Sequence, residues 1–156
     1  MSLNKSELCQ LIPHAGSMCL LDEVRAWSDN HISCTSNTHR DPSNPLRSRN
    51  QLHILCGVEY AAQAMAVHGA LSAEPDQGPM QGFLASVRDL VISAQRLDDI
   101  QGSLQINAER LMGSESSLLY AFNVKVDGME LLSGRASVFL VADIGTNTDS
   151  NKDFSA

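Results

Sequence analysis

One acid in the sequence stands in markedly apolar surroundings. Glu59 lies in a segment rich in alanine, valine and methionine. An ionised carboxylate is costly to desolvate unless it is paired or has a chemical task, although the first turn of a helix also favours an acid. Gln63, one helical turn further on, would share its face and could hydrogen-bond to Glu59, to a partner chain or within the core. Glu59 is therefore the first candidate for a catalytic acid.

Histidines supply the second group that acid and base catalysis needs. His39 opens a long polar loop, His53 stands six residues before Glu59, and His14 follows a proline near the N-terminus. His68 is less suitable, because nine positions along a helix turn it to the side opposite Glu59. Any of these histidines could instead be structural or solvated. The sequence alone leaves His39, His53 and His14 as candidates.

Several other chemistries lack their motifs. The chain has no G-x-S-x-G nucleophile elbow, no G-x-x-x-x-G-K phosphate loop and no G-x-G-x-x-G after a strand. Its cysteines form no C-x-x-C pair and no cluster with the spacing of a zinc site. They are expected to be buried free thiols: Cys9, Cys19, Cys34 and Cys56. We predict no metal and no nucleotide cofactor.

Charge narrows the choice of partners. The 156 residues carry a formal net charge of -7, which disfavours nucleic acid and anionic membranes. The segment 40–49 is an exception, because three arginines, Arg40, Arg47 and Arg49, against Asp41 leave a local charge of +2. That segment is either a solvated face or a surface for an acidic partner. No long apolar stretch or signal core is present, so we expect a cytoplasmic protein.

The element that must carry Glu59 is a long helix over residues 53–71. This segment is too long and too rich in alanine for a strand. At about 100° per residue, Ala62, Ala66 and Ala70 share the face of Glu59 and Gln63. Since the segment is apolar nearly all round, it predicts a buried helix.

The remaining segments predict a helix, a hairpin and an antiparallel sheet. Alternating apolar residues and turn formers, including Asp127-Gly128, mark the strands and their connections. In chain order we expect a helix at 5–11, strands at 18–27 and 31–38, a loop at 40–50, the long helix, and strands at 83–93, 104–109, 118–126 and 136–140. We expect one domain over 1–143 and a disordered tail at 144–156. A long buried helix with strands before and after it predicts an α+β hotdog fold, in which a curved antiparallel sheet wraps the helix.

Ordered motifs add a family resemblance. Leu11-Ile12-Pro13-His14 and Met18-Cys19-Leu20-Leu21-Asp22 resemble the opening of the bacterial 3-hydroxyacyl-acyl carrier protein dehydratases, and Glu59-Tyr60-Ala61-Ala62-Gln63 resembles their E-A-M-A-Q stretch. His39-Arg40-Asp41-Pro42, Asn44-Pro45-Leu46 and the segment 57–66 are more similar to a divergent subfamily associated with aryl-polyene clusters. The resemblance runs in order over roughly residues 8–142.

The resemblance implies dehydration of a 3-hydroxyacyl thioester to the trans-2-enoyl thioester. Glu59 falls on the position of the family's acid, whereas the family's histidine position, 14 residues earlier, is Pro45 (59 minus 14) and the H-F-P-G tract is absent. We therefore predict His39 as the base, with His53 as the alternative. Substrate binding is assigned to His53, Gln63 and Gly57, whose amide would polarise the thioester.

The same resemblance implies partners and alternatives. The substrate would ride on the phosphopantetheine of an acyl carrier protein, with no cofactor of the enzyme's own. The chain would form a homodimer or pair with another hotdog subunit, and alanines beside Glu59 would leave a narrow tunnel for the acyl chain. Two other functions stay open: a hotdog thioesterase, in which the acid activates water, and a non-catalytic acyl-binding subunit of a dehydratase heterodimer.

Overall fold

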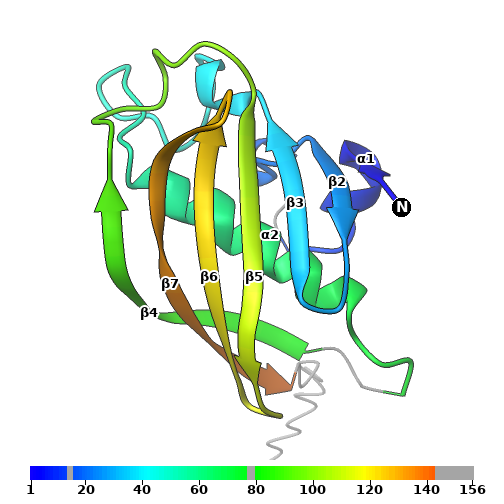
Figure 1. Ribbon diagram of the computed structural model, residues 1–156. Helices are drawn as coiled ribbons and strands as arrows, with labels where there is room; N and C mark the ends of the chain where they lie inside the picture. The colour runs from blue at the N-terminus through cyan, green and yellow to red at the C-terminus, as the bar shows by residue number, and fades with distance from the viewer. Residues whose placement is uncertain (14–15, 77–79, 143–156) are drawn as a thin grey trace, which may run out of the picture.

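A curved antiparallel sheet wraps around one long helix (Figure 1). The structure, a computed structural model, describes residues 1–13, 16–76 and 80–142. Its seven strands follow the order β1-β2-β3-β5-β6-β7-β4, and every neighbouring pair is antiparallel. The elements are β1 Leu3–Asn4, α1 Lys5–Cys9, β2 Glu23–Trp27, β3 His31–Ser36, α2 Cys56–Leu71, β4 Met80–Ile92, β5 Leu104–Gly113, β6 Ser117–Val126 and β7 Met129–Ala142, with short 3-10 helices at Gly16–Met18 and Thr38–Arg40. The predicted α+β hotdog fold is confirmed.

The central helix α2 begins three residues later than predicted. His53 forms an isolated β-bridge with Arg96, and its Nδ1 accepts the Leu55 amide at 3.1 Å. Ile54 is tied to the same segment, because its amide donates to the Gln95 carbonyl at 3.0 Å. These contacts hold the residues before Cys56 in an irregular conformation.

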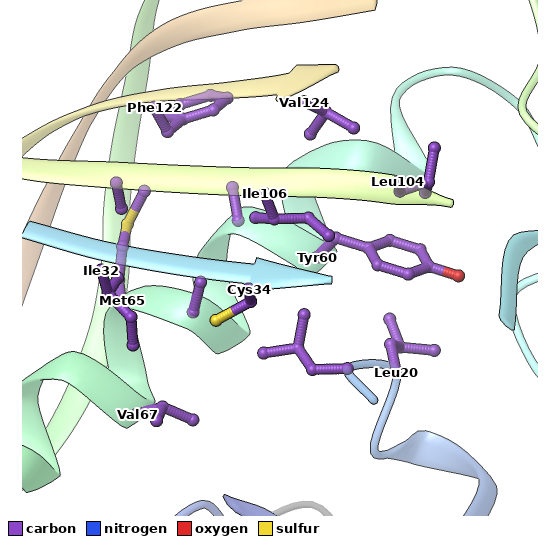
Figure 2. Packing of buried hydrophobic residues seen from close by; sticks show 14 of the residues in the cluster. Leu20, Ile32, Cys34, Tyr60, Met65, Val67, Leu104, Ile106, Phe122 and Val124 are labelled. Carbon is purple, nitrogen blue, oxygen red and sulfur yellow. The ribbon is translucent and has the colours of Figure 1, made fainter. Parts of the chain in front are cut away.

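The inner face of α2 packs against β3, β5 and β6 and forms the core. The labelled side chains in Figure 2 come from the helix, from these three strands and from the segment before β2. Tyr60 and Val67 of the helix, and Ile106 and Val124 of the sheet, are all fully buried. Burial of this apolar surface supplies most of the driving force for the fold.

The outer face of α2 differs from the prediction of a helix buried all round. Ala62 is half-buried, and Ala66 and Ala70 are exposed. The strands of the described residues pack against one side of the helix, and none of these strands covers the alanine face that begins at Glu59. Ala66 and Ala70 are therefore apolar residues that stay exposed in the described part of the chain.

The first helix and the first strand of the chain are both shorter than predicted. Asn4 caps α1 by accepting the Glu7 amide at 3.1 Å, and α1 ends at Cys9 rather than at Leu11. The first hairpin is confirmed, but β2 begins at Glu23 instead of residue 18. Residues 16–18 form a 3-10 turn instead, because the 18–20 segment is hydrogen-bonded to α2 rather than to a strand.

The prediction of four free thiols was wrong for two of them. Cys9 and Cys19 form a disulfide that links α1 to the segment before β2. Cys34 is a buried free thiol, and burial raises its pKa to about 12. Cys56 is free and half-buried. The spacing of cysteines in a sequence does not by itself show which of them pair.

The strands after α2 are longer than their predicted segments. Asp127 and Gly128 form the predicted tight hairpin, with φ angles of 48° and 77°. β7 runs from Met129 to Ala142 and pairs with β6 on one side and β4 on the other. β4 is the last strand that the described residues form in the sheet, so its outer edge pairs with no other described strand.

Parts of the predictions fall on undescribed residues. His14 and the tail from residue 143 to 156 lie outside the described residues, so the predicted domain boundary stays a prediction. None of the helices formed by the described residues has the length and apolarity needed to cross a bilayer.

Candidate active site

Glu59 occupies the first turn of α2, where the positive end of the helix dipole favours a carboxylate. Its side chain is half-buried and lies at the start of the uncovered alanine face. Tyr60, the next residue, turns inward and is fully buried. The helix thus places an acid at its open surface and an aromatic ring in the core directly beside it.

His39 lies in the 3-10 turn Thr38–Arg40 that follows β3. Its side chain is fully buried, and Nε2 lies 3.0 Å from the Ile100 carbonyl oxygen. Because a carbonyl only accepts, Nε2 carries the proton and Nδ1 keeps its lone pair. Nδ1 is buried and has no hydrogen-bond partner among the described residues. Burial is the main cause that lowers the pKa of His39, so the ring is a neutral base at pH 7.

His53 has a different environment from His39. It is exposed and lines an open cleft of about 400 Å³ at the start of α2. Ile54, Ile92 and Ala94 supply apolar surface to this cleft, and Arg96 supplies charge. The role of His53 in substrate binding stays a prediction.

The two other predicted binding residues have structural contacts that occupy their polar groups. Gln63 is buried, with Oε1 accepting the Leu20 amide at 2.9 Å and Nε2 donating to the Met18 carbonyl at 2.7 Å. The Gly57 amide donates to the Ile54 carbonyl at 2.9 Å. Gln63 therefore anchors the 18–20 segment to α2, and the Gly57 amide is hydrogen-bonded within the chain. The substrate-binding roles of both residues stay predictions.

A buried polar network joins the Thr38–Arg40 turn, which carries His39, to α2. The sequence patterns did not predict this network. The Tyr60 hydroxyl lies 2.7 Å from Thr38 Oγ1 and accepts from Asn44 Nδ2 at 3.0 Å. Asn44 Nδ2 also donates to the Thr38 carbonyl at 2.9 Å, and Thr38 Oγ1 donates to the Leu20 carbonyl at 2.8 Å. The available signal was a tyrosine on the inner face of a helix, since a buried phenol needs a partner.

A second unpredicted pair borders the cleft. Arg96 donates two hydrogen bonds to Asp98, and Asp98 Oδ1 also accepts the Leu52 amide at 2.9 Å. The hydrogen bond from Arg96 is the main cause that lowers the pKa of Asp98. This pair holds the 96–98 segment against the residues that precede α2, and so shapes the wall beside His53.

His68 is a structural histidine. It is buried, with Nε2 donating to the Ser28 carbonyl and Nδ1 accepting from the Tyr120 hydroxyl, each at 2.8 Å. Its position on the far side of α2 from Glu59 agrees with the predicted helical geometry. Within the described parts of the chain, no group of three or more His, Cys, Asp or Glu side chains could hold a metal ion.

Comparison with protein families gives a match over nearly the whole chain. The model of the ApeP-like family, described as ApeP dehydratase, matches residues 6–148. No curated protein matches the chain significantly.

Solved structures share the fold at low sequence identity. The dehydratase heterocomplex ApeI:P from Xenorhabdus doucetiae matches with a TM-score of 0.74 and 22% identity, over 87% of this chain and 91% of that one. A thioesterase from Haemophilus influenzae matches with a TM-score of 0.66 and 12% identity, over 93% and 95% of the two chains. A mutant thioesterase from Pseudomonas aeruginosa gives 0.64 and 12%, over 89% and 94%. These likenesses support the hotdog fold.

Proposed function

Because the chain belongs to the ApeP-like family of dehydratases, we propose that it removes water from a 3-hydroxyacyl thioester and leaves the trans-2-enoyl thioester. The family match over residues 6–148 carries this proposal. An acid at the open surface of α2 and a buried neutral histidine are groups of the kinds that the reaction needs.

In the proposed reaction His39 is the base and Glu59 is the acid. His39 Nδ1 takes the proton from the carbon next to the thioester carbonyl, and the electron pair of that C–H bond forms the new double bond. The bond from the neighbouring carbon to the hydroxyl oxygen breaks as Glu59 gives its proton to the departing hydroxyl, which leaves as water. Transfer of a proton from the imidazolium back to the Glu59 carboxylate restores the starting state.

The test is to incubate the purified protein with a 3-hydroxyacyl thioester of an acyl carrier protein and to follow the product by mass spectrometry. We expect the enoyl thioester, with rates about 10²- to 10⁴-fold lower in His39→Ala and Glu59→Gln. His53→Ala is the matched control and should keep most of the activity. Loss of activity in His53→Ala but not in His39→Ala would identify His53, which lines the cleft, as the base.

The same assay separates two alternatives. Hotdog thioesterases share the fold, and release of free acid without the enoyl product would select hydrolysis. A non-catalytic subunit is favoured if the chain is needed for activity in a reconstituted complex but His39→Ala and Glu59→Gln leave that activity unchanged. A similar chain occurs in a dehydratase heterocomplex, which supports testing the complex as well as the single protein.

We also propose a second hotdog subunit, either a copy or a related chain, as partner. β4 is an edge strand of 13 residues, of which none is fully buried. Phe83, Val91 and Ile92 on it are 49%, 55% and 45% exposed. A long apolar edge is a template for strand pairing, and the open alanine face of α2 is a further surface that a subunit could cover.

An acyl carrier protein is the proposed source of the substrate. Arg40 and Arg49 are exposed in the basic segment 40–49, so they could meet an acidic surface. Arg49→Glu should raise KM for a carrier-bound substrate but not for the same acyl group on a pantetheine fragment. Arg25→Glu, which changes an exposed arginine on β2, is the control and should change neither.

A further inference from the structure

The Tyr60 hydroxyl connects the two segments that carry the proposed catalytic pair. Tyr60 follows Glu59 directly on α2, and Thr38 precedes His39 directly in the 3-10 turn. The hydrogen bond of 2.7 Å between Tyr60 and Thr38 is therefore next to His39 and next to Glu59 in the sequence of one chain. Figure 2 shows the Tyr60 ring reaching out from the helix past Leu104, with the hydroxyl at its far end.

The hydrogens of this network can be placed in one consistent direction. Asn44 Nδ2 donates to the Tyr60 oxygen, Tyr60 donates to Thr38 Oγ1, and Thr38 donates to the Leu20 carbonyl. Asn44 also donates to the Thr38 carbonyl at 2.9 Å. Each of these two hydroxyls then gives one hydrogen bond, and both the side chain and the carbonyl of Thr38, the residue before His39, have partners.

Within the described part of the chain, the buried His39 ring has a single hydrogen bond of its own. The ring makes one hydrogen bond, from Nε2 to the Ile100 carbonyl, and its Nδ1 has no partner among the described residues. The position of Nδ1 therefore depends on the packing around the buried ring and on the backbone of the turn, which Ser36 and the contacts of Thr38 hold in place. A hydroxyl on α2 is well placed to determine where this lone pair points.

We propose that Tyr60 is a positioning residue whose hydroxyl fixes the His39 turn relative to the helix that carries Glu59. This inference rests on the proposed function for its catalytic consequence. Burial raises the pKa of Tyr60 to about 12, so the phenol stays protonated at pH 7 and keeps donating to Thr38. Tyr60 acts by holding the turn and exchanges no proton with the substrate.

The test is Tyr60→Phe, which keeps the ring and removes the hydroxyl. Tyr120→Phe is the matched control, because Tyr120 is the other fully buried tyrosine and its hydroxyl bonds to His68 Nδ1 at 2.8 Å, away from the His39 turn. Both variants should unfold at a lower denaturant midpoint. Only Tyr60→Phe should lower kcat, by about 10- to 100-fold for a displaced catalytic group, with KM little changed.

A double-mutant cycle tests the direct link. Thr38→Val removes the hydroxyl that Tyr60 meets while keeping a branched side chain of similar size. We expect Thr38→Val to lower kcat as Tyr60→Phe does. We expect the two losses to be less than additive, because both changes break the Tyr60–Thr38 hydrogen bond, although Thr38→Val also removes the bond to the Leu20 carbonyl and Tyr60→Phe the bond from Asn44. Additive losses would show that the two hydroxyls act separately and would overturn the proposal.

A titration of labelled histidines by NMR tests the positioning without any enzyme assay. In the wild type His39 should titrate below the ordinary value of 6.5. Loosening the turn admits water, so Tyr60→Phe should raise the pKa of His39, whereas Tyr120→Phe should not. The charged groups that influence His39, Arg40 and Asp22, are unchanged in both variants. The His39 signal is assigned from its loss in His39→Ala.

The outcomes separate the two proposals. An unchanged His39 titration together with full kcat in Tyr60→Phe would overturn the positioning role even if His39→Ala is inactive. A shifted His39 titration in a protein with no dehydratase activity would support the positioning role and reject the proposed reaction. Equal losses of kcat in Tyr60→Phe and Tyr120→Phe would indicate a general loss of stability and also count against positioning.

Discussion

Two glycines of α2, Gly57 and Gly69, differ in what a side chain would meet. A Cβ on Gly57 would lie 2.8 Å from Leu132 Cδ2, and close to Val124 and Leu97 as well. A Cβ on Gly69 would meet nothing within 4 Å. The first glycine permits the close approach of α2 to the sheet, whereas the second lies where the helix has free space around it.

Gly57→Ala should therefore destabilise the protein by about 1–3 kcal/mol, because it forces the Leu132 side chain out of its packed position. Gly69→Ala should stabilise it by about 0.5–1 kcal/mol, since alanine is favoured over glycine inside a helix. Urea unfolding of both variants measures the two changes. A Gly57→Ala variant as stable as the wild type would show that Leu132 can move aside at no cost.

His68 and His39 are buried histidines that are neutral in the folded state. Burial is the main cause that lowers the pKa of each below 6.5. In the unfolded chain both would bind a proton as pH falls through about 6.5. The unfolded state then holds more protons than the folded state, so folding stability decreases as pH falls.

The free energy of unfolding should be constant above about pH 7 and decline below 6.5, by at most about 1.4 kcal/mol per pH unit for each histidine. His68→Gln should remove the contribution of His68 to this decline in the free energy of unfolding between pH 8 and 5. Denaturant unfolding across that range is the measurement. A variant whose stability follows the same pH curve as the wild type would contradict a neutral His68 in the folded protein.

At the scale of the element, the edge strand β4 is an exposed apolar surface. Val91 is 55% exposed on this strand, and Met129 is 61% exposed at the start of β7, directly after the tight turn that follows β6. The two residues are similar in exposure and apolar character but lie at different places in the sheet. An edge accepts another strand, whereas a hairpin turn does not.

Val91→Lys should weaken assembly with another hotdog subunit, because lysine on an edge strand opposes pairing. Met129→Lys is the control and should leave assembly unchanged. Sedimentation or light scattering gives the mass of each species. If the wild type has the mass of a single chain alone and with every hotdog partner tried, β4 is not an interface.

At the scale of the whole molecule, the Cys9–Cys19 disulfide closes a loop near the N-terminus. The two cysteines are separated by 10 residues, and the linked segment also contains Met18, which is held by Gln63. The cross-link limits the unfolded chain more than the folded one. The disulfide is therefore expected to increase the free energy of unfolding of the whole molecule.

Reduction of this disulfide should lower the free energy of unfolding by about 3 kcal/mol, the value that the chain-entropy model gives for a loop of this length. Cys9→Ser should show the same loss and be insensitive to reductant. Thermal melts with and without reductant make the comparison. Identical melts in both conditions would mean that the bond contributes nothing to stability.

Much of the fold follows from local patterns in the sequence. The long alanine-rich segment, the alternating strands and the Asp127-Gly128 turn each specify an element through short-range geometry, and the structure contains all of them. The ends of elements were less predictable: β2 lost its first residues because the 18–20 segment hydrogen-bonds to Gln63. Such contacts join residues more than 40 positions apart, so no local pattern contains them.

The sequence by itself determined the fold class, the family and the acid on the central helix, because these depend on residue types and on spacing along one element. Only the tertiary structure decided which side of α2 is covered, that Gln63 and the Gly57 amide are engaged, and that Tyr60 binds the turn that carries His39. These features depend on which groups meet across the core. A polar group on a helix looks the same in sequence whether it binds a substrate or a neighbouring loop, and only its partners in space distinguish the two.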